Sequence, residues 1–202
     1  MTDQVRETWR DPCAQARLLK VVRARADNPR VERRCFTAAL LLLATAASLL
    51  AAAPAPAAGR AGRPVAQTLI GRLNIVRAAH GLAPLRRNGE LEAAARSHSV
   101  EMASVGYFSH DSANGGSFGR RVAHWYAIRP EWLVGENLAW STPRIGSGRV
   151  VQLWLASPEH RANILDPDWR DVGCYAARNH AAPGVYDGEP VTVITCDFGV
   201  RD

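Results

Sequence analysis

The sequence predicts an α+β domain, with helices in its first part and strands at its end. Apolar residues recur at helical spacing in residues 65–81, in 89–104 and again beyond Ser147. Two runs rich in Val, Ile, Tyr, Phe and Cys, DVGCYAA and VTVITCDFGV, then close the chain and indicate strands. Because helices and strands are segregated along the chain, they are expected to form separate layers around one core.

The front of the chain predicts an export or anchoring segment ahead of that domain. Residues 36–53 carry no charge, follow Arg33 and Arg34, and lead into a stretch rich in Pro, Ala and Gly. A basic flank, an apolar run and small residues at its exit are typical of a secretory signal. The uncharged run is also close to the length of a membrane span. The alternatives are a cleaved signal peptide, a retained anchor and a buried helix.

Four parts are therefore expected along the chain. Residues 1–34 form a polar basic leader, which is either a cytoplasmic tail or the product of a start codon assigned too early. Residues 35–57 hold the signal peptide or membrane anchor, residues 58–65 are a linker, and residues 66–202 form the folded domain. This order predicts a secreted or extracytoplasmic protein, or one that residues 36–53 anchor to the membrane.

The charge pattern argues against nucleic acid as a partner of the domain. The chain has 25 basic and 19 acidic residues, a formal net charge of +6. Residues 1–53 account for a net +4, whereas residues 54–202 carry only a net +2. The domain sequence has no cluster of Arg suited to tracking phosphates. Contact with a membrane is expected only through the N-terminal segment.

The first two predicted helices are joined by a short extended connection. Gly81 is placed to end the helix within residues 65–81. Asn88 is placed to cap the second helix, residues 89–104. His98 falls on the apolar face of that second helix, so it is expected to be a hydrogen-bonded core residue.

Residues 106–146 read as a loop-rich middle that contains the segments SHDS and VGENLAW. A third helix follows, with Ser147 as its expected cap. The stretch SPEHRANIL then opens a fourth helix. Ser157 fits its N-cap position, and Pro158 fits the first helical position, where the missing N–H costs nothing.

Two cysteines of the domain are disulfide candidates. Cys174 and Cys196 each lie in one of the two predicted strands. Neighbouring antiparallel strands would bring them within bridging distance, and an even number of cysteines outside the cell favours a bond. The alternative is a pair of buried free thiols.

Three short polar segments carry the candidate functional residues His110, Glu136 and His160. Two imidazoles and one carboxylate can hold a divalent metal with an open position for water. They can also form a general acid–base pair, because a carboxylate fixes the tautomer of an imidazole and favours its charged form. Their spacing matches no helical repeat, so the alternative is three unrelated residues that satisfy loop backbone groups.

The order of several segments resembles the CAP family, which comprises cysteine-rich secretory proteins, insect venom antigens and plant pathogenesis-related proteins. The matching stretches, most similar to the bacterial branch with its SCP-like extracellular domain, are LNIVRAAHGLAPL, LEAAARSHSVEMAS, GYFSHDS, VGENLAW, VVQLWLASPEHRANILDPDWRDVGC and CDFG. The resemblance implies an α-β-α sandwich with a central three-stranded antiparallel sheet. It also implies a central cleft with two histidines and two glutamates, which in several relatives binds a divalent cation, often zinc.

Residue by residue, the resemblance places the two family histidines at His110 and His160 and one glutamate at Glu136. The second family glutamate follows the helical Trp154 by three places, and this chain has Ser157 there. The missing carboxylate weakens the case for acid–base chemistry more than the case for metal binding. Two histidines with waters can still hold zinc, though more weakly.

The combined prediction is a secreted or surface-tethered CAP module whose His110, Glu136 and His160 bind a divalent metal, zinc being the expected ion. Its expected partner is a lipid-like molecule, cell-envelope material or a protein. One alternative is an extracellular hydrolase in which the same three residues activate water. Another is a structural envelope domain without a ligand. A nucleophile at Ser109 beside His110 is disfavoured, because adjacent residues rarely point at each other, so a binding module is expected over an enzyme.

Overall fold

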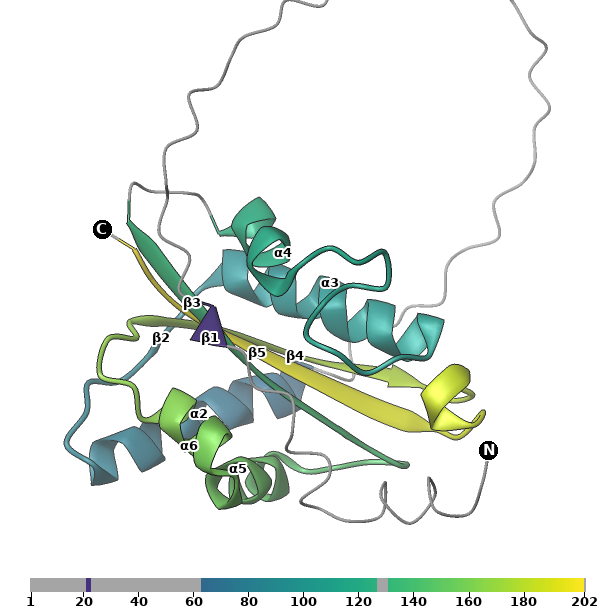
Figure 1. Cartoon of the computed structure of the whole chain (residues 1–202). Helices are drawn as coiled ribbons and strands as arrows, with labels where there is room; N and C mark the ends of the chain where they lie inside the picture. Colours follow the sequence, from purple (N-terminus) through teal and green to yellow (C-terminus); the bar gives the residue numbers. More distant parts are fainter. Residues whose placement is uncertain (1–20, 23–62, 127–130, 202) are drawn as a thin grey trace, which may run out of the picture. The chain divides into compact units, whose positions relative to one another are not determined.

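The computed structural model describes residues 21–22, 63–126 and 131–201 (Figure 1). In chain order its elements are β1 (Val21–Val22), α2 (Arg63–Ala79), β2 (Arg86–Arg87), α3 (Gly89–Val105), α4 (Phe118–Trp125), β3 (Trp132–Ser141), α5 (Ser147–Ala156), α6 (Pro158–Ile164), β4 (Asp171–Asn179), the 3-10 turn η2 (Gly184–Tyr186) and β5 (Val191–Arg201). The predicted signal or anchor at residues 35–57 lies outside the described residues. Within them, no helix has the length and apolar character needed to cross a membrane.

The three long strands form one antiparallel sheet, with a two-residue strand at each edge. The strand order is β1-β3-β5-β4-β2, so β5 is hydrogen-bonded to β3 on one side and to β4 on the other. β1 pairs antiparallel with β3, and β2 pairs parallel with β4. The predicted three-stranded antiparallel sheet is therefore confirmed in β3, β5 and β4, and the short strands extend it.

Helices cover both faces of this sheet (Figure 1). α3 and α4 lie over one face, and α2, α5 and α6 lie over the other. We call these the α3 face and the α2 face. The arrangement is the α-β-α sandwich that the family resemblance implies, and the central residues of all three long strands are buried as a result.

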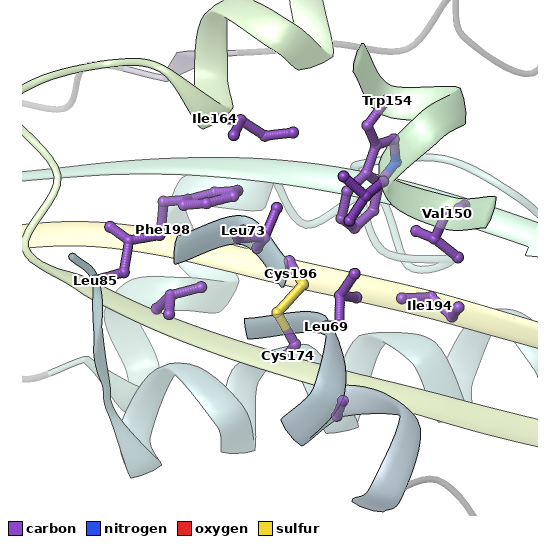
Figure 2. Close-up of a cluster of buried hydrophobic side chains, with 14 of the residues drawn as sticks. Leu69, Leu73, Leu85, Val150, Trp154, Ile164, Cys174, Ile194, Cys196 and Phe198 are labelled. Carbon is purple, nitrogen blue, oxygen red and sulfur yellow. A yellow bond between two sulfur atoms is a disulfide. The ribbon is translucent and has the colours of Figure 1, made fainter. Parts of the chain in front are cut away.

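An apolar cluster fills the space between the sheet and the helices of the α2 face. It joins Leu69 and Leu73 of α2, Trp154 of α5 and Phe198 of β5 (Figure 2). All four side chains are at most 2% exposed. This cluster fixes α5, and through it the start of α6, against the sheet.

Cys174 and Cys196 are joined by a disulfide inside this cluster (Figure 2). They lie directly opposite each other in the β4–β5 register, with their Cα atoms 4.1 Å apart. The predicted pairing is confirmed, and the alternative of two free thiols is wrong.

The segment 106–146 is not loop-rich throughout, contrary to the sequence prediction. It contains the helix α4 and the ten-residue strand β3. The sequence pattern concealed β3 because the strand is covered on both faces and lacks the alternation of apolar and polar residues that marks a half-buried strand. Glu136 therefore lies in the middle of a strand and not in a loop.

The predicted helix starts are confirmed at α3 and shifted by one residue at α5. The Asn88 side-chain oxygen accepts hydrogen bonds from the backbone N–H groups of Glu90 (2.9 Å) and Leu91 (3.1 Å). Such a cap satisfies backbone donors that the first helical turn leaves unbonded. At α5 the N-cap is Gly146, and Ser147 is the first helical residue.

Gly173 allows α3 to lie very close to β4. A Cβ atom at this position would come within 2.0 Å of the Glu92 backbone nitrogen and 2.2 Å of the Leu91 carbonyl carbon. Gly173 also stands opposite Asp197 in the β4–β5 register, and Asp197 stands opposite Glu136 in the β3–β5 register. The backbone of α3 therefore covers the β4 end of the cross-strand row Glu136, Asp197 and Gly173, and this row contains the candidate residue Glu136.

Candidate functional site

The segment Gly135-Glu136-Asn137 contributes side chains to both faces of the sheet. Glu136 points to the α3 face and is fully buried. On the α2 face, Asn137 Nδ2 donates to the His160 carbonyl at 3.2 Å, and Asn137 Oδ1 accepts from Asn163 Nδ2 at 2.9 Å. Gly135 leaves room for Asn163, because a Cβ atom there would lie 2.6 Å from Asn163 Oδ1. The strand β3 thus connects the two helical layers.

His110 lies in the loop between α3 and α4 and is 3% exposed. Its Nδ1 lies 2.6 Å from Glu136 Oε1, and its backbone carbonyl accepts a hydrogen bond from Arg121 Nη1 at 2.6 Å. One residue earlier, the carbonyl of Ser109 accepts a hydrogen bond from His98 Nε2 at 2.8 Å. Side chains from α3 and α4 therefore hold His110 against β3. The expectation that His98 is a hydrogen-bonded core residue is confirmed.

Glu136 has a cation and a second acid as neighbours. Arg121 of α4 forms an ion pair with Glu136 through Nη2 and Oε2. Asp197 of β5 is fully buried and lies directly across the ladder from Glu136. Burial raises the pKa of Glu136 to about 7, and the charge of Arg121 opposes that rise. Burial, followed by the neighbouring Glu136 carboxylate, raises the pKa of Asp197 well above its usual range.

The start of α6 follows the sequence prediction, with Ser157 as N-cap and Pro158 as first helical residue. The Ser157 side chain does not bond the helix backbone, however. Its Oγ lies 2.9 Å from Nδ1 of His160 and 3.3 Å from Oε2 of the exposed Glu159. The residue in place of the second family glutamate therefore contacts the second family histidine directly.

His160 is buried on the α2 face beside Trp154. The two rings are stacked, with centroids 6.4 Å apart and an angle of 18° between their planes. Burial, followed by the charge of His110, lowers the pKa of His160 to about 4, and the charge of Glu159 opposes that shift. His160 is therefore a neutral imidazole at pH 7, as a metal ligand must be.

Both histidines are held through the same ring atom. When Glu136 is ionised its carboxylate can only accept, so His110 then carries a proton on Nδ1. Ser157 donates its O–H to Glu159 and accepts from Nδ1 of His160. In the neutral form of each ring the lone pair then lies on Nε2, the atom that would bind a metal ion.

The structure brings His110 and Glu136 into direct contact, and His160 of α6 lies near enough to His110 for the charge of His110 to lower the pKa of His160. In residues 21–22, 63–126 and 131–201, no group of three or more His, Cys, Asp or Glu side chains is arranged to hold a metal ion. Both oxygens of Glu136 already contact His110 and Arg121. Glu136 is therefore a hydrogen-bond partner of His110, and its role as a metal ligand stays a prediction.

Sequence reasoning missed Arg121 and Asp197. Arg121 is one of many arginines in the sequence, and the pattern of its segment predicts a loop. Asp197 had a usable signal, because it is the single charged residue in the run VTVITCDFGV. A lone carboxylate inside an apolar strand that is covered on both faces needs a polar partner. Asp197 lies directly opposite Glu136 in the β3–β5 register, so that partner is Glu136.

Comparison with known sequences matches residues 70–198 to the cysteine-rich secretory protein family, CAP. The uncharacterized membrane protein YlbC of Bacillus subtilis is 31% identical over 107 residues, which is 53% of this chain and 30% of YlbC. The uncharacterized protein YkwD of the same organism is 34% identical over 103 residues, which is 50% of this chain and 37% of YkwD. The match thus spans about a third of the length of these curated relatives.

Comparison with solved structures gives the same fold. An extracellular protein containing a SCP domain from Bacillus anthracis superposes with a TM-score of 0.53 at 29% identity. The match covers 70% of this chain and 41% of that protein. The fold predicted from the sequence therefore agrees with an experimentally determined neighbour over most of the described residues.

Proposed function

The chain belongs to the cysteine-rich secretory protein family, and on this premise we propose that it is an extracytoplasmic binding module in which His110 and His160 bind one divalent cation. Zinc is the expected ion. One observation carries the proposal: both imidazoles are buried and each is held through Nδ1, so both present Nε2 as the coordinating atom. The extracellular Bacillus anthracis neighbour and the membrane protein YlbC support a location outside the cytoplasm.

The donor set fits zinc by its chemistry. Neutral imidazole is a common zinc ligand, and a ligating histidine usually donates its other N–H to a carboxylate or another acceptor. Glu136 has that role for His110, and Ser157 has it for His160. With two protein ligands the remaining positions belong to water, so the affinity should be lower than in structural sites with four protein ligands.

The open positions of such an ion would accept an oxygen atom of a partner. Following the family resemblance, we assign the partner to lipid-like molecules, cell-envelope material or a protein. The near-neutral charge of residues 54–202 argues against nucleic acid.

Zinc titration with element analysis tests the proposal. The protein should bind one zinc, and His110→Ala and His160→Ala should each weaken binding at least tenfold. His180→Ala is the matched control, because His180 is exposed and far along the chain from both ligands. Binding in the double variant as tight as in the parent protein would show that the shared site is wrong.

Turnover assays separate the binding module from a hydrolase. The pair His110–Glu136 resembles an imidazole–carboxylate pair that could activate water. Peptide, ester and peptidoglycan substrates should nevertheless remain intact during incubation with the zinc-loaded protein. Turnover that disappears in His160→Ala would replace the binding module with the hydrolase.

A further inference from the structure

Two helices of the α2 face carry basic residues and no acidic ones. Residues 63–88, which include α2, contain five arginines and no Asp or Glu, and residues 137–158, which include α5, contain two arginines and no acid. In contrast, the helices of the α3 face together carry three Glu and three Arg, and α6 carries one of each, Glu159 and Arg161. Positive charge without a compensating acid is therefore concentrated on α2 and α5.

Three exposed arginines gather at the contact between α2 and the start of α5. Arg72 lies on α2, Arg144 lies in the loop before α5, and Arg149 lies in the first turn of α5. Arg72 reaches α5, because its Nε donates to Ser147 Oγ at 3.2 Å and a Cβ atom on Gly148 would lie 3.4 Å from its Cζ. Within the described residues, no carboxylate forms an ion pair with these three arginines. Their charges are thus available to a partner.

Ile75 adds an apolar side chain to the same surface. It follows Arg72 by three positions, so the two residues lie on one side of α2. Ile75 is 70% exposed, the largest exposed fraction among the large apolar residues that the structure describes. The neighbouring exposed positions Gly71, Ala78 and Ala79 have short side chains or none, so Ile75 and Arg72 project beyond them. Apolar contact together with the attraction of basic residues to anionic lipids is how a protein surface binds at a membrane interface.

The place of α2 in the chain brings this surface close to a membrane. Nine residues separate the start of α2 at Arg63 from the uncharged run 36–53, which the sequence predicts to be a signal or anchor. Nine residues span at most about 30 Å when fully extended. In the anchored form, α2 and the adjoining α5 (Figure 1) are therefore within reach of the lipid headgroups.

We propose that the surface formed by Arg72, Ile75, Arg144 and Arg149 docks on a membrane that carries anionic lipid headgroups. Each arginine beside such a membrane strengthens binding roughly fivefold. A second copy of the chain is a poor occupant, because two such surfaces would repel each other. The docked domain has a fixed orientation, with α2 and α5 against the lipid and α3 away from it. The proposal uses no residue of the proposed zinc site, so either can fail alone.

The full chain reconstituted into lipid vesicles tests this orientation. With Cys13 and Cys35 replaced by serine, a dye whose emission reports polarity is attached through Ile75→Cys or, as the control, through Val105→Cys. Val105 is a comparable aliphatic residue on α3, 56% exposed. Relative to vesicles of phosphatidylcholine alone, vesicles that also contain phosphatidylglycerol should shift the emission at position 75 to the blue and leave position 105 unchanged. Salt at about 1 M, which shortens the screening length to about 3 Å, should reverse the shift.

Three results of this comparison would overturn the proposal. They are failure of the protein to float with the anionic vesicles, equal emission from position 75 in both kinds of vesicle, and equal shifts at positions 75 and 105. A blue shift at position 75 that needs a soluble acidic polymer such as RNA, and that vesicles do not produce, would assign the surface to another partner and overturn the proposal as well.

Charge reversal tests the arginines themselves. Arg144→Glu combined with Arg149→Glu should abolish the shift at position 75. Folding should be kept, because a carboxylate in the first turn of α5 is favoured by the helix dipole. The control combines Arg96→Glu and Arg120→Glu, which are exposed on α3 and α4 and change the net charge by the same amount. This control should retain the shift, and an equal loss in both variants would show that net charge alone acts. Zinc titration of the same samples reports separately on the metal site.

Discussion

His98 shows how one buried side chain fixes a functional loop. It lies on α3, is fully buried, and donates from Nε2 to the carbonyl of Ser109, next to His110. The same helix holds the loop at two further points, since Glu101 accepts from the Tyr107 hydroxyl at 2.7 Å and from the Ala113 amide at 3.3 Å. The position of His110 thus depends on α3 as much as on Glu136.

The neutral state of His98 predicts a dependence of stability on pH. Burial lowers its pKa to about 2, whereas the unfolded value is about 6.5. Below about pH 6.5 the unfolded chain binds a proton that the folded chain does not, so His98 stabilises the fold fully above that pH and less at each lower pH. Relative to His98→Gln, which cannot titrate, wild type should lose about 1.4 kcal/mol per pH unit from pH 6 to 4.

Equilibrium denaturation of both proteins at pH 7, 6, 5 and 4 checks this difference. His80→Gln serves as the control, because His80 is exposed at the end of α2. A constant difference between wild type and His98→Gln across the range would contradict a neutral buried His98.

Ser157 predicts an effect on zinc that a simple helix cap would not have. Its Oγ contacts Nδ1 of His160 and makes no capping bond to the helix backbone. Ser157→Ala should therefore cost about 1 kcal/mol of stability through the lost hydrogen bond. It should also weaken zinc binding about tenfold, because the imidazole loses the partner that orients it.

Ser147→Ala is the matched control for that measurement. Ser147 is likewise buried at the start of a helix, and its Oγ accepts from Arg72 Nε at 3.2 Å. It should lose similar stability and keep its zinc affinity. Equal zinc affinity in wild type and Ser157→Ala by calorimetry would remove Ser157 from the proposed site.

The sequence predicts only those residues of the candidate site that stand in segments resembling the family. His110 and His160 stand in short segments with recognisable neighbours, and the capping chemistry of Ser157 and Pro158 is local. Arg121 and Asp197 act through contacts between α4, β3 and β5, so their roles depend on strand register and helix placement. Neither register nor placement is visible in a single sequence when a strand is buried on both faces.

At the scale of elements, β3 is where prediction failed and where the site is organised. Its central residues include Glu136 and Asn137. Both are polar, so the sequence pattern predicts a loop at these positions. In the fold they alternate between the faces, where Glu136 contacts the His110 loop and Asn137 contacts α6. The strand tolerates them because each has hydrogen-bond partners, which offset the cost of burying a polar group.

Gly173 predicts how strongly the α3–β4 contact stabilises the fold. A methyl group at this position would overlap the backbone of Leu91 and Glu92, which cannot move without shifting α3. Gly173→Ala should therefore cost about 3 kcal/mol or more. Gly71→Ala is the control, because Gly71 is exposed on α2 and no atom lies within 4 Å of the added carbon. It should stabilise the protein by up to about 1 kcal/mol.

Thermal and denaturant unfolding of the two alanine variants checks this contrast. Because Gly173 adjoins the Asp197–Glu136 row, Gly173→Ala should also disturb zinc binding, whereas Gly71→Ala should not. Wild-type stability in Gly173→Ala would show that α3 can retreat from the sheet at little cost.

At the scale of the whole molecule, the elements that carry the core and the site lie within residues 63–201. The Cys174–Cys196 disulfide ties the two neighbouring strands β4 and β5 and suits an oxidising compartment. β1 is different, because it adds residues 21–22 to the edge of β3 at Val134 and Gly135. That pairing requires residues 21–22 to lie on the same side of any membrane as the domain, and cleavage at the predicted export signal would remove it.

Removal of the N-terminal segment should leave the fold intact. A chain of residues 58–202 keeps both helical layers, the three long strands and the disulfide, and of the strand pairings in the described residues it loses the two-residue pairing of β1. We expect cooperative unfolding, with a Tm within a few degrees of that of the full chain. A decrease of less than about 1 kcal/mol in the free energy of unfolding gives a shift of this size for a domain of this length. Val22→Pro in the full chain is the matched comparison, because proline removes the backbone N–H from β1 and leaves the leader in place. Loss of cooperative unfolding in residues 58–202, together with a similar loss in Val22→Pro, would make β1 part of the folded domain and would count against a cleaved signal peptide.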